Sequence, residues 1–386
     1  MRTARRAAEI QAFEVMEVLS RAHALERAGR RVVHMEIGEP DFSAPEPVVE
    51  AGVRALREGR TAYTATLGLP ALREVIAEHY ASRFSVPVPA ERIVITAGAS
   101  GGLLTVAALY VDAGDDVLVP DPGYPGYRHF VRAFEGRARP LGVSAAENFQ
   151  PTLEMVRAAW QAGTRGLILG SPSNPTGTVI DRGELTRIAA FIAERGGVLI
   201  VDEIYQGLTY GAEPRTALDL PGEVVVINSF SKYFCMTGWR LGWVVLPAHV
   251  VRGFEKLAQH LFISAPAAAQ HAACAAFSAP SLAILEQRRG EFARRRDLLL
   301  PALKGAGLAV PAEPQGAFYV YAHCGRDARE YCRELLEREA VAATPGVDFG
   351  AHATAQHVRF AYTRPLEELE EAARRIRRFA LCAPAA

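Results

Sequence analysis

The sequence has no net charge, few cysteines, few lysines and no long hydrophobic run. Lysine plus arginine and aspartate plus glutamate each total 43, so we expect no overall field that would hold nucleic acid or an anionic membrane. No stretch approaches the roughly 20 apolar residues of a membrane span. Glu9, Glu14 and Glu17 soon interrupt the basic start, which argues against a signal peptide. We expect a cytoplasmic protein whose partners are small molecules.

Cysteine is too sparse and too irregularly spaced to suggest a structural role. The cysteines are odd in number, and no two of them form a CxxC pair. This pattern favours neither a disulfide framework nor a thiolate metal site, so we expect reduced thiols and no metal. The five are Cys235, Cys274, Cys324, Cys332 and Cys382.

Short apolar runs alternate regularly with helix-like segments from about Ile93 onward. The runs are RIVIT, DDVLV, RGLILG, GGVLIVDE, EVVVINSF and LGWVVL. Strands that alternate with helices predict βαβ units and a mostly parallel sheet. After Ala267 the pattern is helical, and strand-like VYAHC and HVRFAY precede a closing helix from Leu366. We therefore predict an α/β fold with a large central domain and a smaller lobe built from both chain ends.

Proline and glycine gather in turn-rich segments at the ends of the predicted strands. These segments are GEPDFSAPEP, PDPGYPGY, SPSNPTGT and EPQGAFY. Loops at the carboxyl ends of parallel strands are where α/β sheets bind ligands. The predicted site therefore lies at this edge of the sheet.

The scarcity of lysine narrows the search for a reactive amine. Lys256 and Lys304 lie in polar-faced helical segments, where a solvated ammonium is the simplest interpretation. Lys232 instead follows an apolar strand and has aromatic neighbours, which would desolvate it, lower its pKa and free its lone pair for a carbonyl. Ser229, Ser231 and Arg240 add donors suited to a phosphate. A short Ser/Lys turn followed by an arginine is also common without any function.

Further candidate residues follow other predicted strands. Asp202, at the end of GVLIVDEIY, can hold a protonated ring nitrogen, but it can equally cap a following helix, and Tyr205 can be plain packing. Asn174, in SPSNPTG, offers an amide donor or is simply a turn residue. The segment TAGASGGL presents backbone N–H groups of Ala99 and Ser100 at a helix N-terminus, which suits a phosphate.

Taken together, the motifs resemble class I aminotransferases of the aspartate aminotransferase superfamily, which use pyridoxal 5'-phosphate (PLP) on fold type I. The motifs are GEPDF, YTATLGLPALRE, SPSNPTG, DEIY, SFSKYFCMTGWRLGW, QGAFY and PGVDFG, and the resemblance runs from about Ile37 to Tyr362. It implies a mostly parallel seven-stranded sheet in a large domain over residues 45–290. It also implies a small α+β domain over residues 291–386, to which residues 1–44 contribute together with an active-site lid.

The resemblance also implies roles for the candidates around the cofactor. Lys232 would hold PLP as a Schiff base and shuttle the substrate's Cα proton, and Asp202 would pair with the pyridine nitrogen. Asn174 and Tyr205 would hydrogen-bond the phenolic oxygen, and Tyr124 would stack on the ring. The phosphate ligands would be Ala99, Ser100, Ser229 and Arg240, with Tyr63 reaching in from the other subunit of a homodimer. We expect Ser231 to be a cofactor-binding hydroxyl as well.

The implied substrates are an L-amino acid and a 2-oxo acid such as 2-oxoglutarate or pyruvate. Arg359 in HVRF would bind the α-carboxylate, assisted by the Gly38 backbone. Ser100 stands where aspartate- and prephenate-specific relatives can carry a lysine that meets the distal carboxylate. The expected lid residues Phe13, Val15 and Met16 are apolar. We therefore expect a neutral, apolar or aromatic amino donor.

Two other functions remain open on sequence grounds. A PLP-dependent carbon–sulfur β-lyase or an enzyme like aminocyclopropane carboxylate synthase would use the same cofactor residues. A regulator with a PLP-binding domain would need a DNA-binding domain ahead of GEPDF, which begins at Gly38. We expect neither such a domain nor binding to nucleic acid.

Overall fold

The large lobe is built on a seven-stranded sheet, which confirms the predicted fold class. A computed structural model describes residues 3–211 and 215–381. All neighbouring strands are parallel except β8, which runs antiparallel to both of its neighbours. The strand order is β2 (Ile93–Thr96), β8 (Gly242–Val245), β7 (Glu223–Ser229), β6 (Val198–Asp202), β5 (Thr164–Gly170), β3 (Asp116–Asp121) and β4 (Arg137–Gly142).

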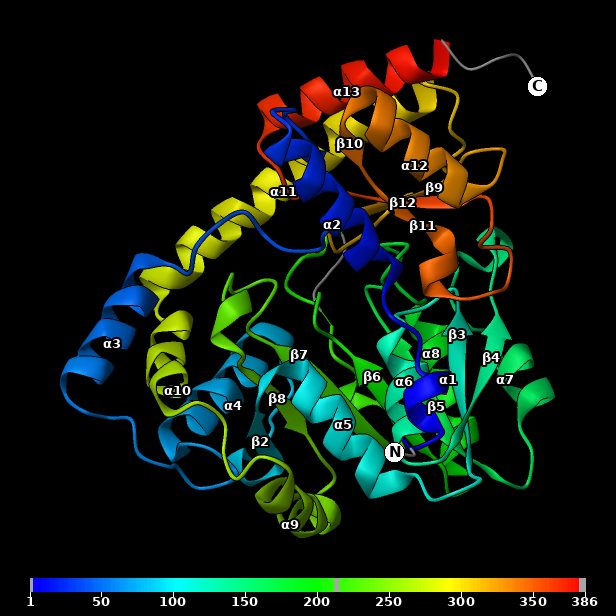
Figure 1. Cartoon of the computed structure of the whole chain (residues 1–386). Helices are drawn as coiled ribbons and strands as arrows, with labels where there is room; N and C mark the ends of the chain where they lie inside the picture. The colour runs from blue at the N-terminus through cyan, green and yellow to red at the C-terminus, as the bar shows by residue number, and fades with distance from the viewer. Residues whose placement is uncertain (1–2, 212–214, 382–386) are drawn as a thin grey trace.

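The central strands are buried on both faces, which explains why they read as continuous apolar runs. Ile200 points into a cluster with α5, α6 and α9, whereas its neighbour Val201 points into the opposite cluster with α4, α8 and α10. Figure 1 shows these helices around the sheet. Their bounds are α4 Pro70–Phe84, α5 Gly98–Tyr110, α6 Gly126–Ala133, α8 Arg182–Ala193, α9 Val251–Leu261 and α10 Ala267–Cys274, with α3 Glu46–Arg57 and α7 Leu153–Ala159 outside them.

The smaller lobe joins the two ends of the chain. Its antiparallel sheet has the order β11 (Thr344–Pro345), β12 (His357–Ala361) and β9 (Tyr319–His323). Near the N-terminus, β1 (Val33–His34) pairs with β10 (Val341–Ala342), so the first residues are tied to the last quarter of the chain. The lobe's helices are α2 Glu14–Arg27, α12 Ala328–Glu339 and α13 Leu366–Leu381, and a short α1 spans Arg6–Glu9.

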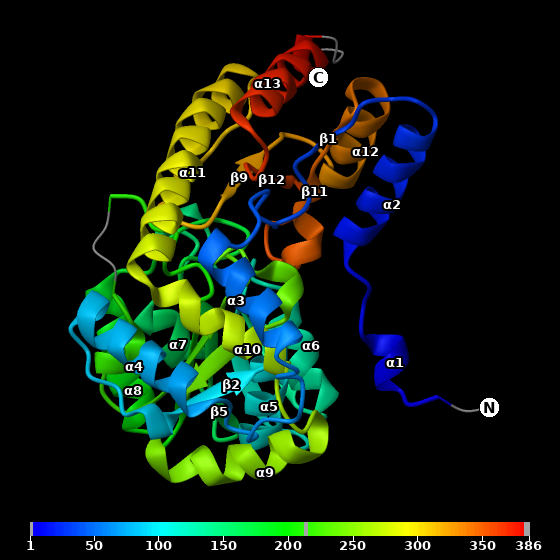
Figure 2. The ribbon, with the colours of Figure 1, turned by 90° about the vertical axis from the view of Figure 1, so that its left-hand side faces the viewer.

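A single long helix, α11 (Ala279–Gly305), runs from the large lobe to the smaller one (Figure 2). The expected boundary at residue 290 lies inside this helix, so the division at that residue stays a prediction. Within the described ranges no single helix is long and apolar enough to cross a membrane. One pair bent by 81°, Ala267–Phe277 with Ala279–Gly305, meets the length and composition criteria only when its two parts are taken together.

The predicted free thiols can be checked for four of the five cysteines. Cys235, Cys274, Cys324 and Cys332 are unpaired, and two of them, Cys235 and Cys332, are buried. Cys382 lies outside the described residues.

Candidate active site

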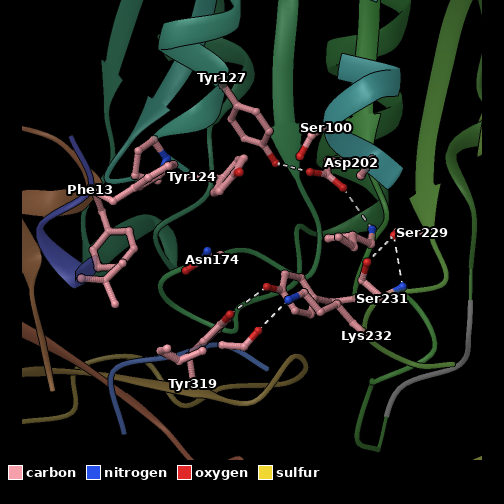
Figure 3. Close-up of a pocket in the computed structure, with 18 of the residues that line it drawn as sticks. Phe13, Ser100, Tyr124, Tyr127, Asn174, Asp202, Ser229, Ser231, Lys232 and Tyr319 are labelled. Carbon is pink, nitrogen blue, oxygen red and sulfur yellow. Dashed lines mark hydrogen bonds between the residues drawn. The ribbon is translucent and has the colours of Figure 1, made fainter. Parts of the chain in front are cut away.

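A cavity of about 300 Å³ lies at the carboxyl ends of β5, β6 and β7, between the two lobes (Figure 3). The sheet, the N-terminus of α5 and the start of α2 all contribute to its lining. The structure brings every predicted site residue to this cavity except Tyr63. Those that line it are Phe13, Val15, Met16, Gly38, Ala99, Ser100, Tyr124, Asn174, Asp202, Tyr205, Ser229, Ser231, Lys232, Arg240 and Arg359.

Lys232 is the lysine of this cavity, and its surroundings favour the neutral amine. Its Nζ donates to the carbonyl oxygen of Gly38 at 2.5 Å. Burial lowers the pKa of Lys232 to about 8, and the positive charges of Arg359 and Arg240 act in the same direction, whereas Glu39 opposes them. Near pH 8 about half of the population is therefore uncharged and nucleophilic.

The other two lysines are exposed and lie outside the cavity. Lys256 is exposed on α9, and Lys304 on α11 forms an exposed ion pair with Glu313 at 2.6 Å. Neither lines the cavity. This agrees with the predicted choice of Lys232.

Asp202 ends β6 at the floor of the cavity and is buried. Its Oδ2 accepts the Tyr127 hydroxyl at 2.9 Å, and its Oδ1 accepts the Ile204 backbone N–H at 3.1 Å (Figure 3). Burial raises the pKa of Asp202 to about 6, although both hydrogen bonds and Lys232 lower it. The chain continues as a turn rather than a helix, so Asp202 does not cap a helix. Above about pH 6 the carboxylate form therefore predominates, and a carboxylate can pair with a cationic ring.

Tyr127 was missed by sequence reasoning, which singled out only Tyr124 in the segment DPGYPGY. The two rings pack edge to face with centroids 5.3 Å apart, and both line the cavity. Tyr127 is buried because α6 turns it towards the sheet, whereas Tyr124 is only partly buried. The repeated Pro-Gly-Tyr spacing was a signal that more than one tyrosine faces the site.

Arg359 and Asn174 form a pair on the side of the cavity nearest the smaller lobe. Arg359 Nη1 donates to Asn174 Oδ1 at 2.9 Å, and its Nη2 donates to the carbonyl oxygen of Glu36. Because a guanidinium only donates, the amide oxygen must face Arg359, and the Asn174 amide nitrogen remains available as a donor. Arg359 is 5% exposed, its Nε has no hydrogen-bond partner, and its hydrogen bonds among the described residues go to an amide, a backbone carbonyl and a hydroxyl rather than to a carboxylate. A buried cation without a carboxylate partner suits an anionic ligand.

The far end of the cavity combines an arginine, two serines and a helix N-terminus. The Ser229 hydroxyl donates to Ser231 Oγ at 3.0 Å, and α5 begins at Gly98 without a side-chain cap. Gly98 has φ +72°, and a Cβ there would lie 2.7 Å from Arg240 Nη2. Glycine therefore lets the guanidinium approach the uncapped N–H groups of α5. Arginine and a helix N-terminus together make an anion site of the kind that binds phosphate.

The start of α2 covers the cavity with apolar side chains. Phe13, Val15 and Met16 line it, as expected, although Phe13 is 39% and Met16 55% exposed. The Glu14 backbone N–H donates to Asp348 Oδ1 at 2.9 Å, which holds the start of this helix in place. Sequence reasoning missed Asp348, whose carboxylate also lines the cavity and whose pKa burial raises.

The two arginines that might have supplied a distal cation are engaged outside the cavity. Arg21 forms two hydrogen bonds with Glu337, and Arg128 Nη2 donates to the Asp348 carbonyl oxygen at 3.1 Å. Neither lines the cavity. Tyr63 is 81% exposed and lies away from the cavity of its own chain, so its predicted role in a second subunit stays a prediction.

Comparisons with known proteins agree with one another over nearly the whole chain. The family model for aminotransferases of class I and II matches residues 30–376. The chain is 39% identical to a (5-formylfuran-3-yl)methyl phosphate transaminase of Methanocaldococcus jannaschii, over 97% of this chain and 98% of the relative. It is 38% identical to a valine–pyruvate aminotransferase of Mycobacterium tuberculosis, over 96% of each.

Solved structures give the same picture. An aminotransferase from Mycobacterium tuberculosis superposes with a TM-score of 0.95 at 37% identity, covering 99% of this chain and 100% of the other. Aspartate aminotransferase from Thermus thermophilus with maleate gives a TM-score of 0.93 at 34% identity, covering 98% and 100%.

Proposed function

The chain belongs to the family of class I and II aminotransferases, and from that premise we propose that it binds PLP through Lys232 and prefers a neutral amino donor. The protein is an aminotransferase that acts on an amino acid and a 2-oxo acid. The cofactor, the residue roles and the preference within this class are our proposals.

The residues present fit PLP group by group. The partly buried amine of Lys232, with its lowered pKa, suits the aldehyde of PLP, and Ser229, Arg240 and the N-terminus of α5 suit its phosphate. Asp202 suits the ring nitrogen, while Tyr205 and the free amide nitrogen of Asn174 suit the phenolic oxygen. When bound, PLP supplies an electron sink for the charge that develops at the substrate Cα.

The observation that carries the proposal is the placement of Arg359 and Lys232 on one cavity. Arg359 is a buried guanidinium that hydrogen-bonds no carboxylate among the described residues, so it can bind the substrate α-carboxylate. Lys232 is the partly buried amine whose lowered pKa allows it to take and return the Cα proton near neutral pH. With the carboxylate held by Arg359, the substrate Cα would lie in the same cavity as Lys232 Nζ, the group that would move its proton.

A product analysis tests transamination against the lyase alternative. The purified holoenzyme is mixed with one amino acid and one 2-oxo acid, and the new amino acid and new oxo acid are quantified. We expect them in equal amounts and without ammonia. Ammonia and pyruvate from cystathionine, released without any oxo acid, would contradict the proposal and favour a β-lyase.

We predict that alanine, valine, leucine, methionine and phenylalanine are better donors than aspartate. The lid residues Phe13, Val15 and Met16 are apolar, Ser100 is neutral, and Asp348 adds a carboxylate to the lining. Burying an unpaired distal carboxylate here costs several kcal/mol, which corresponds to a preference of roughly a hundredfold or more in kcat/KM. The measurement compares kcat/KM for aspartate, alanine and phenylalanine at a fixed oxo acid.

Two variants show where the preference originates. Asp348→Asn keeps the shape of the side chain and removes its charge, so it is expected to improve aspartate relative to alanine. Arg21→Ala removes an exposed arginine that is paired with Glu337, and it should leave the ratio unchanged. If aspartate is the best donor by about tenfold or more, the argument from the lining is wrong, and a mobile cation such as Arg128 must enter the site.

We further propose a cytoplasmic homodimer in which Tyr63 reaches the phosphate end of the partner's cavity. In its favour, Tyr63 is a large, 81% exposed aromatic side chain, and Leu56 nearby in sequence is 60% exposed. A subunit contact would remove these side chains from water, which favours association.

A further inference from the structure

Tyr319 is a buried tyrosine that lines the cavity. It begins β9 in the smaller lobe, and its hydroxyl lies 2.8 Å from the hydroxyl of Tyr205 in the large lobe (Figure 3). Both side chains are almost fully buried, at 1% and 4% exposure. This contact therefore links the two lobes inside the cavity. Its partner in the large lobe, Tyr205, is the residue proposed to hydrogen-bond the phenolic oxygen of the cofactor.

The backbone at Gly38 is shaped around the Tyr319 hydroxyl. A Cβ at Gly38 would lie 1.8 Å from that hydroxyl oxygen, so any larger residue would displace the tyrosine. The carbonyl oxygen of the same glycine accepts the Lys232 amine. Gly38 thus contacts both Tyr319 and Lys232. A displacement of the Gly38 backbone would therefore change the positions of both side chains.

The direction of the hydrogen bond between the tyrosines depends on what Tyr205 meets. Either hydroxyl can donate when the two are considered alone. Once Tyr205 donates its only proton to an acceptor in the cavity, its oxygen can only accept, and Tyr319 must be the donor. Tyr205 is the only hydrogen-bond partner of the Tyr319 hydroxyl among the described residues, so nothing there competes for that proton.

Arg359 strengthens Tyr319 as a donor. Its guanidinium carbon lies 4.4 Å from the centre of the Tyr319 ring, over the ring face. A cation over the ring draws electron density from the phenol, which makes the hydroxyl a better donor. Tyr319 therefore connects the proposed carboxylate-binding arginine with the residue proposed to meet the cofactor oxygen.

We infer that Tyr319 is a positioning residue that donates to Tyr205 and thereby strengthens the hydrogen bond from Tyr205 to the phenolic oxygen of the cofactor. The inference rests on the proposed binding of PLP by Lys232. A stronger donor at the phenolic oxygen would weaken that oxygen's attraction for the proton that it would share with Lys232 Nζ. Tyr319 therefore lowers the pH at which this proton is lost.

The test is a spectroscopic pH titration of the bound cofactor in Tyr319→Phe, with no substrate present. Loss of one neutral hydrogen bond that acts through Tyr205 is expected to raise the midpoint by about 0.5 to 1 pH unit. Tyr319→Leu also lacks the hydroxyl and should shift the midpoint in the same direction, so the test does not depend on the folding of one variant. Circular dichroism confirms the fold of each.

Tyr321→Phe is the matched control. Tyr321 lies two residues further along β9, is 1% exposed, and has a hydroxyl without a hydrogen-bond partner. Removing that hydroxyl leaves the titration midpoint at the parent value if the inference is correct. In a Tyr205→Phe background, removal of the Tyr319 hydroxyl should add no further shift, because the intermediary is gone.

The outcomes separate this inference from the proposed function. Suppose that the parent binds the cofactor and gives a titration midpoint, while the midpoint of Tyr319→Phe shifts no more than that of Tyr321→Phe. In that case the inference is overturned and PLP binding stands. The inference is also overturned if removal of the Tyr319 hydroxyl shifts the titration midpoint as much in the Tyr205→Phe background as in the parent. Tyr319 would then act on the cofactor directly. If the parent shows no lysine-bound chromophore at all, the proposed function has failed.

Discussion

Lys232→Ala is expected to lose the visible absorbance of lysine-bound PLP and to turn over roughly 10³-fold or more slowly. Alanine removes both the covalent attachment and the group that moves the Cα proton. Lys232 Nζ is the only lysine amine among the described residues that lines the cavity, so no neighbouring lysine can replace it. The measurements are the absorbance spectrum with added PLP and single-turnover rates with a good amino donor.

Two other lysines provide matched controls for this loss. Lys256→Ala and Lys304→Ala remove exposed amines, the second with its ion pair to Glu313, and exposed pairs contribute roughly 1 kcal/mol or less. Both variants should keep the parent's spectrum and rates. A small primary amine added to Lys232→Ala should restore part of the turnover, because it can enter the space that the side chain leaves. Substantial turnover of Lys232→Ala without such an amine would refute the mechanism.

The fold and much of the site could be predicted because both depend on local signals. Strands buried on both faces read as continuous apolar runs. Asp202 ends one of these strands, and the turns after two others carry Asn174 and Lys232. Parallel strands end at the same edge of the sheet, so residues far apart in sequence converge there. With only three lysines in the chain, the choice of Lys232 needed no tertiary information.

The site residues that could not be predicted from the sequence are placed by contacts between residues far apart in the chain. Tyr127 and Tyr319 lie in turn-rich or strand segments where a tyrosine is ordinarily a packing residue, and only the structure places their hydroxyls on Asp202 and Tyr205. Asp348 becomes part of the site because the start of α2 docks on it from the other end of the chain. Such pairings span 75 or more residues, and no periodicity encodes them.

Asp202→Ala is expected to bind PLP but to slow the half-reaction with an amino acid by roughly 10²- to 10³-fold or more. The carboxylate is buried, so it faces a cationic ring nitrogen in a medium of low dielectric, where the pair is worth several kcal/mol. Without it the ring does not stay protonated and takes up less of the charge that develops at the substrate Cα. Stopped-flow absorbance measures the half-reaction directly.

Three further variants show whether the charge of Asp202 or its geometry matters. Asp202→Asn keeps the size of the side chain and removes the charge, so it should be nearly as slow as Asp202→Ala. Asp202→Glu keeps the charge but crowds the hydrogen bonds from Tyr127 and Ile204, and it should be less harmful. Tyr127→Phe removes one hydrogen bond that stabilises the carboxylate, so its effect should be smaller still, at about tenfold. Rates for Asp202→Ala close to those of the parent would mean that Asp202 only stabilises the turn after β6.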